Sequence, residues 1–189
     1  KIGKVRYFGF SNIEKKQLID VFKTKHPVLK KLISIELQFN IIERKAEKYF
    51  FDYCKKKNLN IFFNQVFAKG ILLNKYSENK EFPKKSRAFL SLSLRNKLNN
   101  KILRFSNNLD ILAKSMNIEL NNMILSWTMS KFDNSISILG FSKKEQVLNY
   151  NKIHLYKNYK EIDYKIEKLV KKDLYYKKIY DRPKQFINL

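Results

Sequence analysis

The sequence predicts an α/β fold with a parallel sheet and outer helices, and the prediction depends on two observations. Four short apolar runs each end at a glycine or a polar residue, and a stretch with helical spacing follows each run. Strands that alternate with helices in this order pair in parallel through right-handed crossovers. The 189 residues suffice for one domain with a proper hydrophobic core.

The first strand is expected at Val5 to Phe8, where the apolar run stops on Gly9. Ser11 and Asn12 then stand at the start of a helix, and either side chain could cap it. The residues from Ile13 to Phe22 have helical spacing, and the helix should end before Pro27.

Two further strands are expected at Leu32 to Phe39, which alternates apolar and polar residues, and at Asn60 to Gln65. Between them, Arg44 to Lys57 is expected to be one helix with Cys54 in the core. A loop through Lys69 and Gly70 follows the third strand.

The remaining sequence predicts a surface loop over 74–85, a fourth strand at Ser135 to Leu139 closed by Gly140, and several helices. These helices are expected at 87–97, 100–116, 120–131, from Ser142 to about Leu155, and from Tyr159 onward. Ser142 to Glu145 fits a capping box that would open the fourth of them.

The formal net charge of +23 has two interpretations. A strong positive field attracts nucleic acid and phosphorylated ligands. Lysines spread along the whole chain beside many Asn, Ile, Tyr and Phe would also follow from A+T-rich coding DNA.

The single cysteine predicts a reducing, cytoplasmic setting. Because no apolar run approaches about 20 residues, no membrane span is expected.

Polar side chains at the ends of the expected strands are the first candidate site. Ser11, Asn12 and Gln38 could hydrogen-bond a ligand amide, which needs both donors and acceptors. Helix capping and ordinary strand-end solvation are the alternative explanations.

The turn Gly140-Phe141-Ser142-Lys143 is the second candidate, because a helix N-terminus with a lysine in reach attracts anions. A plain helix cap would look the same. The two histidines, His26 and His154, stand far apart in the sequence, and no metal site is expected.

Five segments in order resemble the second half of aldo/keto reductases. GKVRYFGFSN at 3–12 resembles the pattern G-K-I/V-R-x-I-G-V-S-N, and the segment at 38–44 resembles Q-x-x-x-N-x-x-x-R. The segment at 53–76 is similar to C-x-x-x-G-I-x-V-x-A-Y-S-P-L-A-x-G-L-L-x-G-K-Y. The segment at 111–127 resembles I-A followed by A-L-x-W, and ISILGFSKKEQ at 136–146 resembles V-x-V-I-P-G-x-S-x-x-E-Q.

The resemblance implies that residues 1–189 form a single partial domain, the C-terminal half of a (β/α)8 TIM barrel whose N-terminal half is absent. It further implies an NADP(H)-dependent reductase of a small carbonyl substrate. The preference for NADP over NAD is inferred from Lys143 and from the positive charge of the whole chain. The cofactor-binding residues it implies are Ser11, Asn12, Gln38, Asn64, Gln65, Phe67, Lys69, Gly140, Phe141, Ser142, Lys143 and Gln146. Asn64 stands where the family usually has a tyrosine that stacks on the nicotinamide ring.

The family's catalytic Asp, Tyr, Lys and His lie in the first half of the barrel, so no catalytic residue is expected in this chain. A second hypothesis is a catalytically inactive half-barrel that binds RNA or a large assembly. It depends on the lysines and tyrosines that alternate from Tyr159 to Tyr180, which could pair with phosphates and stack on bases. The same segment could equally be the terminal helix of the barrel.

Overall fold

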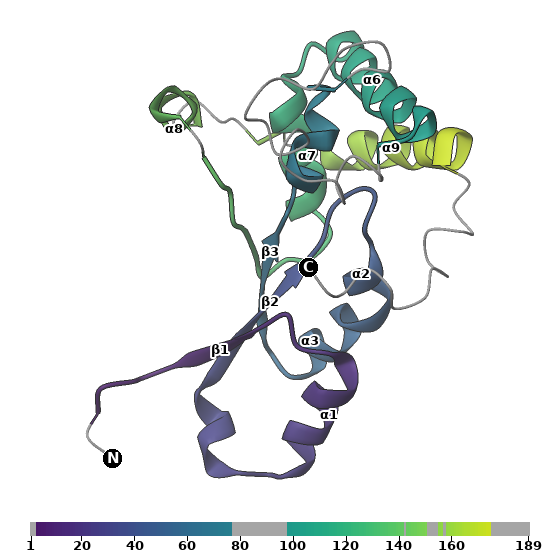
Figure 1. Cartoon of the computed structure of the whole chain (residues 1–189). Coiled ribbons are helices and arrows are strands. Elements are labelled where there is room, and N and C mark those ends of the chain that lie inside the picture. The colour runs from purple at the N-terminus through teal and green to yellow at the C-terminus, as the bar shows by residue number, and fades with distance from the viewer. Residues whose placement is uncertain (1–2, 77–97, 142, 151–154, 157, 175–189) are drawn as a thin grey trace. The chain divides into compact units, whose positions relative to one another are not determined.

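The computed structural model describes residues 3–76, 98–141, 143–150, 155–156 and 158–174 (Figure 1). The strands are β1 (Phe8–Ser11), β2 (Leu32–Gln38), β3 (Asn60–Asn64) and β4 (Ser135–Ser137). The helices are α1 (Lys15–Lys23), η1 (Pro27–Lys31), α2 (Lys45–Tyr49), α3 (Phe51–Lys56), η2 (Ala68–Leu73), α6 (Asn100–Ser115), α7 (Leu120–Met129), α8 (Lys144–Tyr150) and α9 (Tyr159–Leu174), where η1 and η2 are 3₁₀ helices.

The chain divides into two compact units. The first comprises Lys1–Val66 and Thr128–Gly140, and the second comprises Phe67–Trp127 and Phe141–Leu189. Most of the loop expected over 74–85 and the whole helix expected over 87–97 lie outside the described residues.

The first unit contains a four-stranded sheet in the order β1-β2-β3-β4. All three neighbouring pairs are parallel, which confirms the predicted α/β architecture with a parallel sheet. β2 and β3 lie within a residue of their predicted bounds, because both have strong apolar patterns that end at polar residues.

The prediction for β1 was wrong by three residues. The strand begins at Phe8 rather than ending there, and the side chains of Val5 and Tyr7 are each 62% exposed. Gly9, which we expected to stop the strand, lies inside it opposite Ser34. A Cβ at residue 9 would lie 2.4 Å from Ser34 Oγ, so the glycine permits β1 to approach β2 closely.

The predicted cap of α1 was also wrong. The helix begins after Glu14, whose backbone N–H donates to Gln17 Oε1 at 2.9 Å. Ser11 and Asn12 bond each other instead, with Asn12 Nδ2 donating to Ser11 Oγ at 3.0 Å. Both side chains are therefore outside the helix and remain available at the end of β1.

The single helix expected over 44–57 is two helices, α2 and α3, which are separated at Phe50. The break turns Phe51 into the core, where its ring lies 5.2 Å from that of Phe39 and 5.8 Å from that of Phe63, measured between centroids. Cys54 is fully buried beside this cluster, as predicted. Burial raises the pKa of its thiol to about 12, so the thiol stays protonated and is a poor nucleophile.

In the second unit, α6 and α9 pack against each other. Each helix presents a buried apolar stripe at helical spacing, formed by Leu103, Leu109 and Ala113 in α6 and by Ile162, Ile166, Val170 and Leu174 in α9. Asn108 Nδ2 donates to Asp173 Oδ2 at 2.8 Å and links the two helices. The expected terminal helix from Tyr159 is thereby confirmed as far as Leu174.

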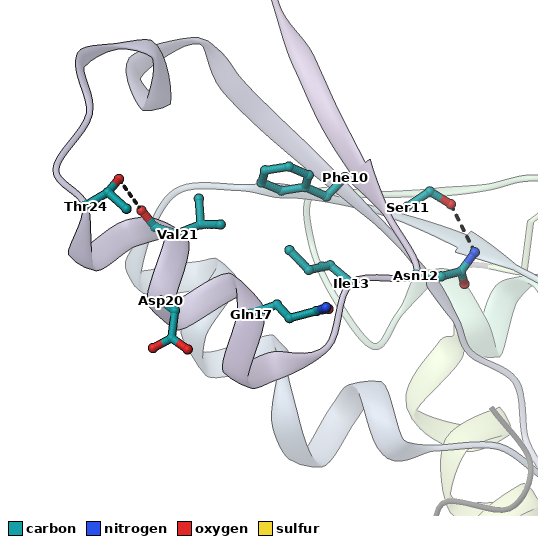
Figure 2. A pocket seen from close by; sticks show the side chains of 8 residues that line it. All are labelled: Phe10, Ser11, Asn12, Ile13, Gln17, Asp20, Val21 and Thr24. Carbon is teal, nitrogen blue, oxygen red and sulfur yellow. Dashed lines mark hydrogen bonds between the residues drawn. The ribbon is translucent and has the colours of Figure 1, made fainter. Parts of the chain in front are cut away.

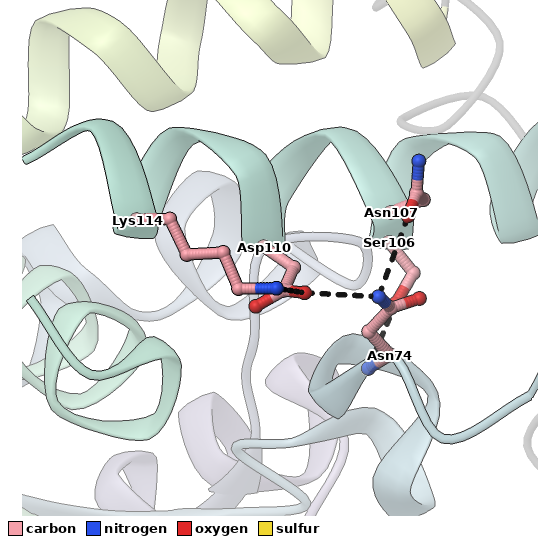
Figure 3. Close-up of polar contacts among 5 residues, drawn as sticks. All are labelled: Asn74, Ser106, Asn107, Asp110 and Lys114. Carbon is pink, nitrogen blue, oxygen red and sulfur yellow. Dashed lines mark hydrogen bonds and ion pairs between the residues drawn. The ribbon is translucent and has the colours of Figure 1, made fainter.

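Ser106 connects α6 to the end of η2 (Figure 3). Its hydroxyl donates to the backbone oxygen of Ile71 at 2.6 Å and accepts from the backbone N–H of Asn74 at 3.1 Å. Asn74 Nδ2 also donates to Asp110 Oδ2 at 3.1 Å. Hydrogen bonding from Lys114, aided by Asn74, lowers the pKa of Asp110 below its usual 3.8.

The helix expected from Ser142 to about Leu155 is α8 over Lys144–Tyr150, and residues 151–154 lie outside the described residues. Across the described ranges, no helix is long and apolar enough to cross a bilayer.

Candidate functional site

The carboxyl ends of β1, β2 and β3 place polar side chains on one face of the sheet. Ile35 and Leu37 of β2 are buried in the core, so Glu36 and Gln38 between and after them face the other way. In the sheet register, Glu36 pairs with Ser11 of β1 and Gln38 pairs with Asn64 of β3. In parallel α/β folds this end of the sheet is where ligands bind.

Glu36 is a candidate site residue that the sequence did not predict. In the motif Q-x-x-x-N-x-x-x-R, the glutamine stands four residues before the asparagine; counted from Asn40 and Arg44, that position is Glu36 rather than Gln38. The motif spacing was therefore the signal that could have found it. The role proposed for Gln38 remains a prediction, and Glu36 joins the candidate set.

Asn64 contacts Glu36 directly. Asn64 Nδ2 donates to Glu36 Oε1 at 2.8 Å, and both residues are half-buried. Asn64 Oδ1 is buried and has no hydrogen-bond partner in the structure. A buried acceptor without a partner is costly in a finished site, and a ligand donor would satisfy it.

Ser11 and Asn12 line a pocket of about 670 Å³ between β1 and α1 (Figure 2). Phe10, Ile13 and Val21 form its apolar part, and the other lining residues are Gln17, Asp20 and Thr24. Asn12 has a left-handed backbone (φ 53°), and its N–H donates to the backbone oxygen of Glu36 at 2.9 Å. This bond holds the turn after β1 against the end of β2.

Asn40, only 1% exposed, fixes the loop beside this site. Its Nδ2 donates to the backbone oxygen of Gln65 at 3.0 Å, and its Oδ1 accepts from the N–H groups of Ile42 and Glu43. Gln65 itself has a left-handed backbone (φ 53°). Asn40 thus positions the residue that directly follows β3.

The other predicted site residues, except Gly140, belong to the second unit. Lys69 has a left-handed backbone (φ 60°) and lies in η2, directly after Phe67 and Ala68. The Phe67 backbone oxygen accepts from the N–H groups of Gly70 and Leu72. These contacts form a tight turn in the segment that the resemblance assigns to the pyrophosphate loop.

At the start of α8, Gln146 Oε1 accepts from the backbone N–H of Lys143 at 3.1 Å. Gln146 therefore caps the helix, which is the alternative to an anion site that the sequence left open for this turn. Lys143 is exposed. Gly140 and Phe141 are exposed as well, and Ser142 lies outside the described residues. No group of three or more His, Cys, Asp or Glu that could hold a metal occurs among the described side chains.

Comparison with known proteins finds relatives that match most of the chain. The model of the Aldo/keto reductase family matches residues 1–166. Two curated proteins of Schizosaccharomyces pombe, both named as candidate aryl-alcohol dehydrogenases, are 27% identical to the chain over 147 residues. The match covers 77% of this chain and 44% or 40% of theirs, so the chain spans less than half the length of these relatives.

Solved structures show the same fold at lower identity. The glycerol dehydrogenase AKR11B4 of Gluconobacter oxydans matches with a TM-score of 0.74 at 22% identity, covering 91% of this chain and 51% of that protein. An aldo/keto reductase of Klebsiella pneumoniae in complex with NADP and acetate matches with a TM-score of 0.56 at 13% identity, covering 90% and 49%. The chain belongs to the aldo/keto reductase family.

Proposed function

We propose that the chain supplies the nicotinamide-binding side of an NADP(H)-dependent reductase of small aldehydes or ketones. The observation that carries the proposal is the group of polar strand ends, with Ser11, Glu36, Gln38 and Asn64 on one face of the sheet. The unpartnered Asn64 Oδ1 and the hydroxyl of Ser11 fit a primary carboxamide, which offers an NH2 group as donor and a carbonyl oxygen as acceptor.

The cofactor, when bound, supplies the hydride. The residues of this chain bind and orient it: Ser11, Asn12 and Gln38 are proposed to hold the carboxamide, with Asn64 beside the ring. Gln65, Phe67 and Lys69 are proposed for the pyrophosphate, and Gly140, Phe141, Ser142, Lys143 and Gln146 for the adenosine end. A cytoplasmic setting remains the prediction made from the single cysteine.

We further propose that these residues are the second half of a barrel, and that the proton donor belongs to the other half. The curated and structural relatives extend beyond the matched region, which accounts for 40–51% of their length. The chain alone is therefore expected to bind the cofactor without reducing carbonyls.

Titration of the chain with NADPH and NADH, followed by nucleotide fluorescence or calorimetry, tests the cofactor proposal. A hydrogen-bonded lysine–phosphate contact predicts at least about tenfold tighter binding of NADPH. Lys143→Ala should remove most of this preference, whereas the matched control Lys144→Ala, which changes the adjacent exposed lysine, should keep it. Equal affinity for both nucleotides would refute the NADP preference, and absence of binding would refute the cofactor site.

RNA binding is the second candidate, and α9 offers it little support. The helix carries five lysines against four acidic residues, and its apolar stripe is buried against α6. Filter binding to RNA at two salt concentrations distinguishes the two functions, since phosphate-driven affinity falls steeply with salt.

A further inference from the structure

Exposed lysines gather at the amino ends of the strands in the first unit, at the opposite end of the sheet from the candidate cofactor site. Each helix between parallel strands runs back along the sheet, so the carboxyl ends of α1 and α3, and η1 as well, lie beside the amino ends of β2 and β3. We call this group of exposed lysines the basic end; its members are Lys23, Lys25, Lys30, Lys31, Lys55, Lys56 and Lys57.

The connections at the other end of the same sheet carry no lysine. Residues 12–14, 39–44, 65–66 and 138–140 directly follow the four strands, and their one cation, Arg44, is buried and ion-paired with Glu47. A+T-rich coding DNA would enrich lysine at both ends alike. Helix dipoles favour a basic last turn in α1 and α3 but do not account for Lys25, which lies beyond α1. The positive charge of this unit is therefore concentrated at one end.

The lysines of the basic end are available to a partner. Of this group, only Lys23 forms an ion pair with another described residue, Asp20, at 2.9 Å. Lys57 Nζ lies 4.9 Å from the ring centroid of Phe22 and 6.0 Å from that of Tyr53. These cation–π contacts hold the ammonium group in place and leave its charge unneutralised.

A pocket of about 310 Å³ adjoins the basic end through Lys55, which is one of its lining residues. Phe51 and Phe132, whose ring centroids are 5.4 Å apart, contribute to its apolar part. Asn58 and Asn134 contribute amide groups. The lining also includes two carboxylates, those of Asp52 and Asp133. Aromatic surface combined with hydrogen-bond donors and acceptors suits a nucleobase, whose edge carries both kinds of group.

We propose that the basic end binds the phosphates of a single-stranded nucleic acid and that the pocket beside Lys55 receives one of its bases. Lysines neutralise phosphates without reading sequence, and single-strand sites combine such charges with surfaces that hold bases. The pocket favours a nucleic acid over an anionic membrane, because a flat bilayer surface has no group to place among amides and carboxylates. The surface is separate from α9, and the inference does not rest on the proposed cofactor function.

Fluorescence anisotropy of the full chain with a labelled oligocytidylate RNA of about 20 nucleotides, across a salt series, tests this assignment. Cytosine is the chosen base because its amino group can donate to the carboxylates of the pocket. The logarithm of the affinity for a single strand falls with the logarithm of the salt concentration, with a slope of about −0.7 per neutralised phosphate.

Lys30→Gln combined with Lys31→Gln removes two of these contacts and should reduce the slope by about 1.4. If the contacts contribute nothing at 1 M salt, the same change weakens binding at about 0.1 M salt by about 25-fold. Lys171→Gln combined with Lys172→Gln makes the same charge change at exposed positions of α9 and should leave slope and affinity unchanged. Lys30→Arg combined with Lys31→Arg keeps the charge and should keep the wild-type affinity, which separates loss of charge from a folding defect.

Asn134→Ala tests the pocket. It should weaken binding about 2- to 10-fold at an unchanged salt slope, as expected for one lost hydrogen bond to a base. Absence of RNA binding, equal losses in the η1 and α9 variants, or an unchanged affinity in Asn134→Ala would overturn the assignment. Binding of phosphatidylserine vesicles in place of RNA would overturn it in favour of a membrane. Displacement of RNA by NADPH would overturn it as well, whereas failure of NADPH to bind would reject only the proposed function.

Discussion

At the scale of single residues, Gly9 shows how one missing side chain sets the register of two strands. The residue lies inside β1 opposite Ser34, with a normal strand backbone. Its requirement for glycine is therefore steric and comes from the 2.4 Å distance between a Cβ at this position and Ser34 Oγ. Real Cβ atoms are not found so close to another heavy atom, so the Ser34 side chain would have to move or the strands would have to separate.

Gly9→Ala is expected to lower the free energy of unfolding by about 1–3 kcal/mol, the usual range for overpacking. Gly9→Ala combined with Ser34→Ala should recover part of the loss, because it removes the hydroxyl but leaves the Ser34 backbone oxygen at 3.0 Å. Urea unfolding of the two single variants and the double variant measures the coupling. Strictly additive effects would show that the close approach does not determine the cost.

At the scale of elements, Ser106 shows how a helix is joined to the turn beside it. Ser106 is 1% exposed, and its hydroxyl donates to the Ile71 oxygen and accepts from the Asn74 N–H. Figure 3 shows Ser106 beside Asn74. Ser106→Ala leaves both backbone groups unpaired, which should cost about 1–3 kcal/mol of unfolding free energy.

Ser115→Ala is the matched control for Ser106→Ala in α6. Its hydroxyl donates only to the Leu112 oxygen, on an exposed position at the end of the same helix. The expected change is within about 0.5 kcal/mol, typical of exposed sites. Equal effects of the two substitutions in thermal or urea unfolding would contradict the role given to Ser106.

The elements also show what the sequence could predict. β2 and β3 were predictable because alternation and polar stops are local signals. The start of β1 was not, because it depends on how closely Gly9 approaches Ser34, which is 25 residues away in the chain. The break at Phe50 depends in the same way on the aromatic cluster of Phe39, Phe51 and Phe63.

The candidate site was predictable as a set of strand ends but not in its chemistry. Ser11 and Gln38 follow from the pattern of strands and stops, and Asn64 follows from the resemblance to the family. Glu36 was missed because the glutamine of the motif was assigned to Gln38, whereas the spacing from Asn40 and Arg44 points to Glu36; nothing in the sequence indicated that Asn64 is its partner. Only the register between β2 and β3 brings Asn64 Nδ2 within 2.8 Å of its carboxylate.

At the scale of the whole molecule, the two outer strands of the sheet determine how the chain should behave in solution. β1 and β4 lie at the ends of the sheet order, so each has one edge without a neighbouring strand among the described residues. Ile136 of β4 is 53% exposed and Ile138, just after it, is 44% exposed. Open edges with exposed apolar side chains favour pairing with another chain.

The net charge of +23 opposes such pairing, and salt should decide between the two effects. The Debye length falls to about 8 Å at 0.15 M and about 3 Å at 1 M salt, so repulsion between chains weakens while edge pairing does not. The chain alone is expected to be monomeric at low salt and to self-associate as the salt concentration rises. Sedimentation velocity across a salt series measures this.

Two lysine substitutions distinguish edge pairing from general salting-out. Ile136→Lys places a charge on the outer strand and should shift the onset of association to higher salt. Ile111→Lys removes an equally exposed isoleucine, at 56%, from α6 in the second unit and should leave the onset in place. If both variants shift the onset equally, net charge controls association and the open edge does not.

A chain that stays monomeric throughout would show that β1 and β4 need no covering strand, and the proposal of a half-barrel completed by further strands would lose its physical basis.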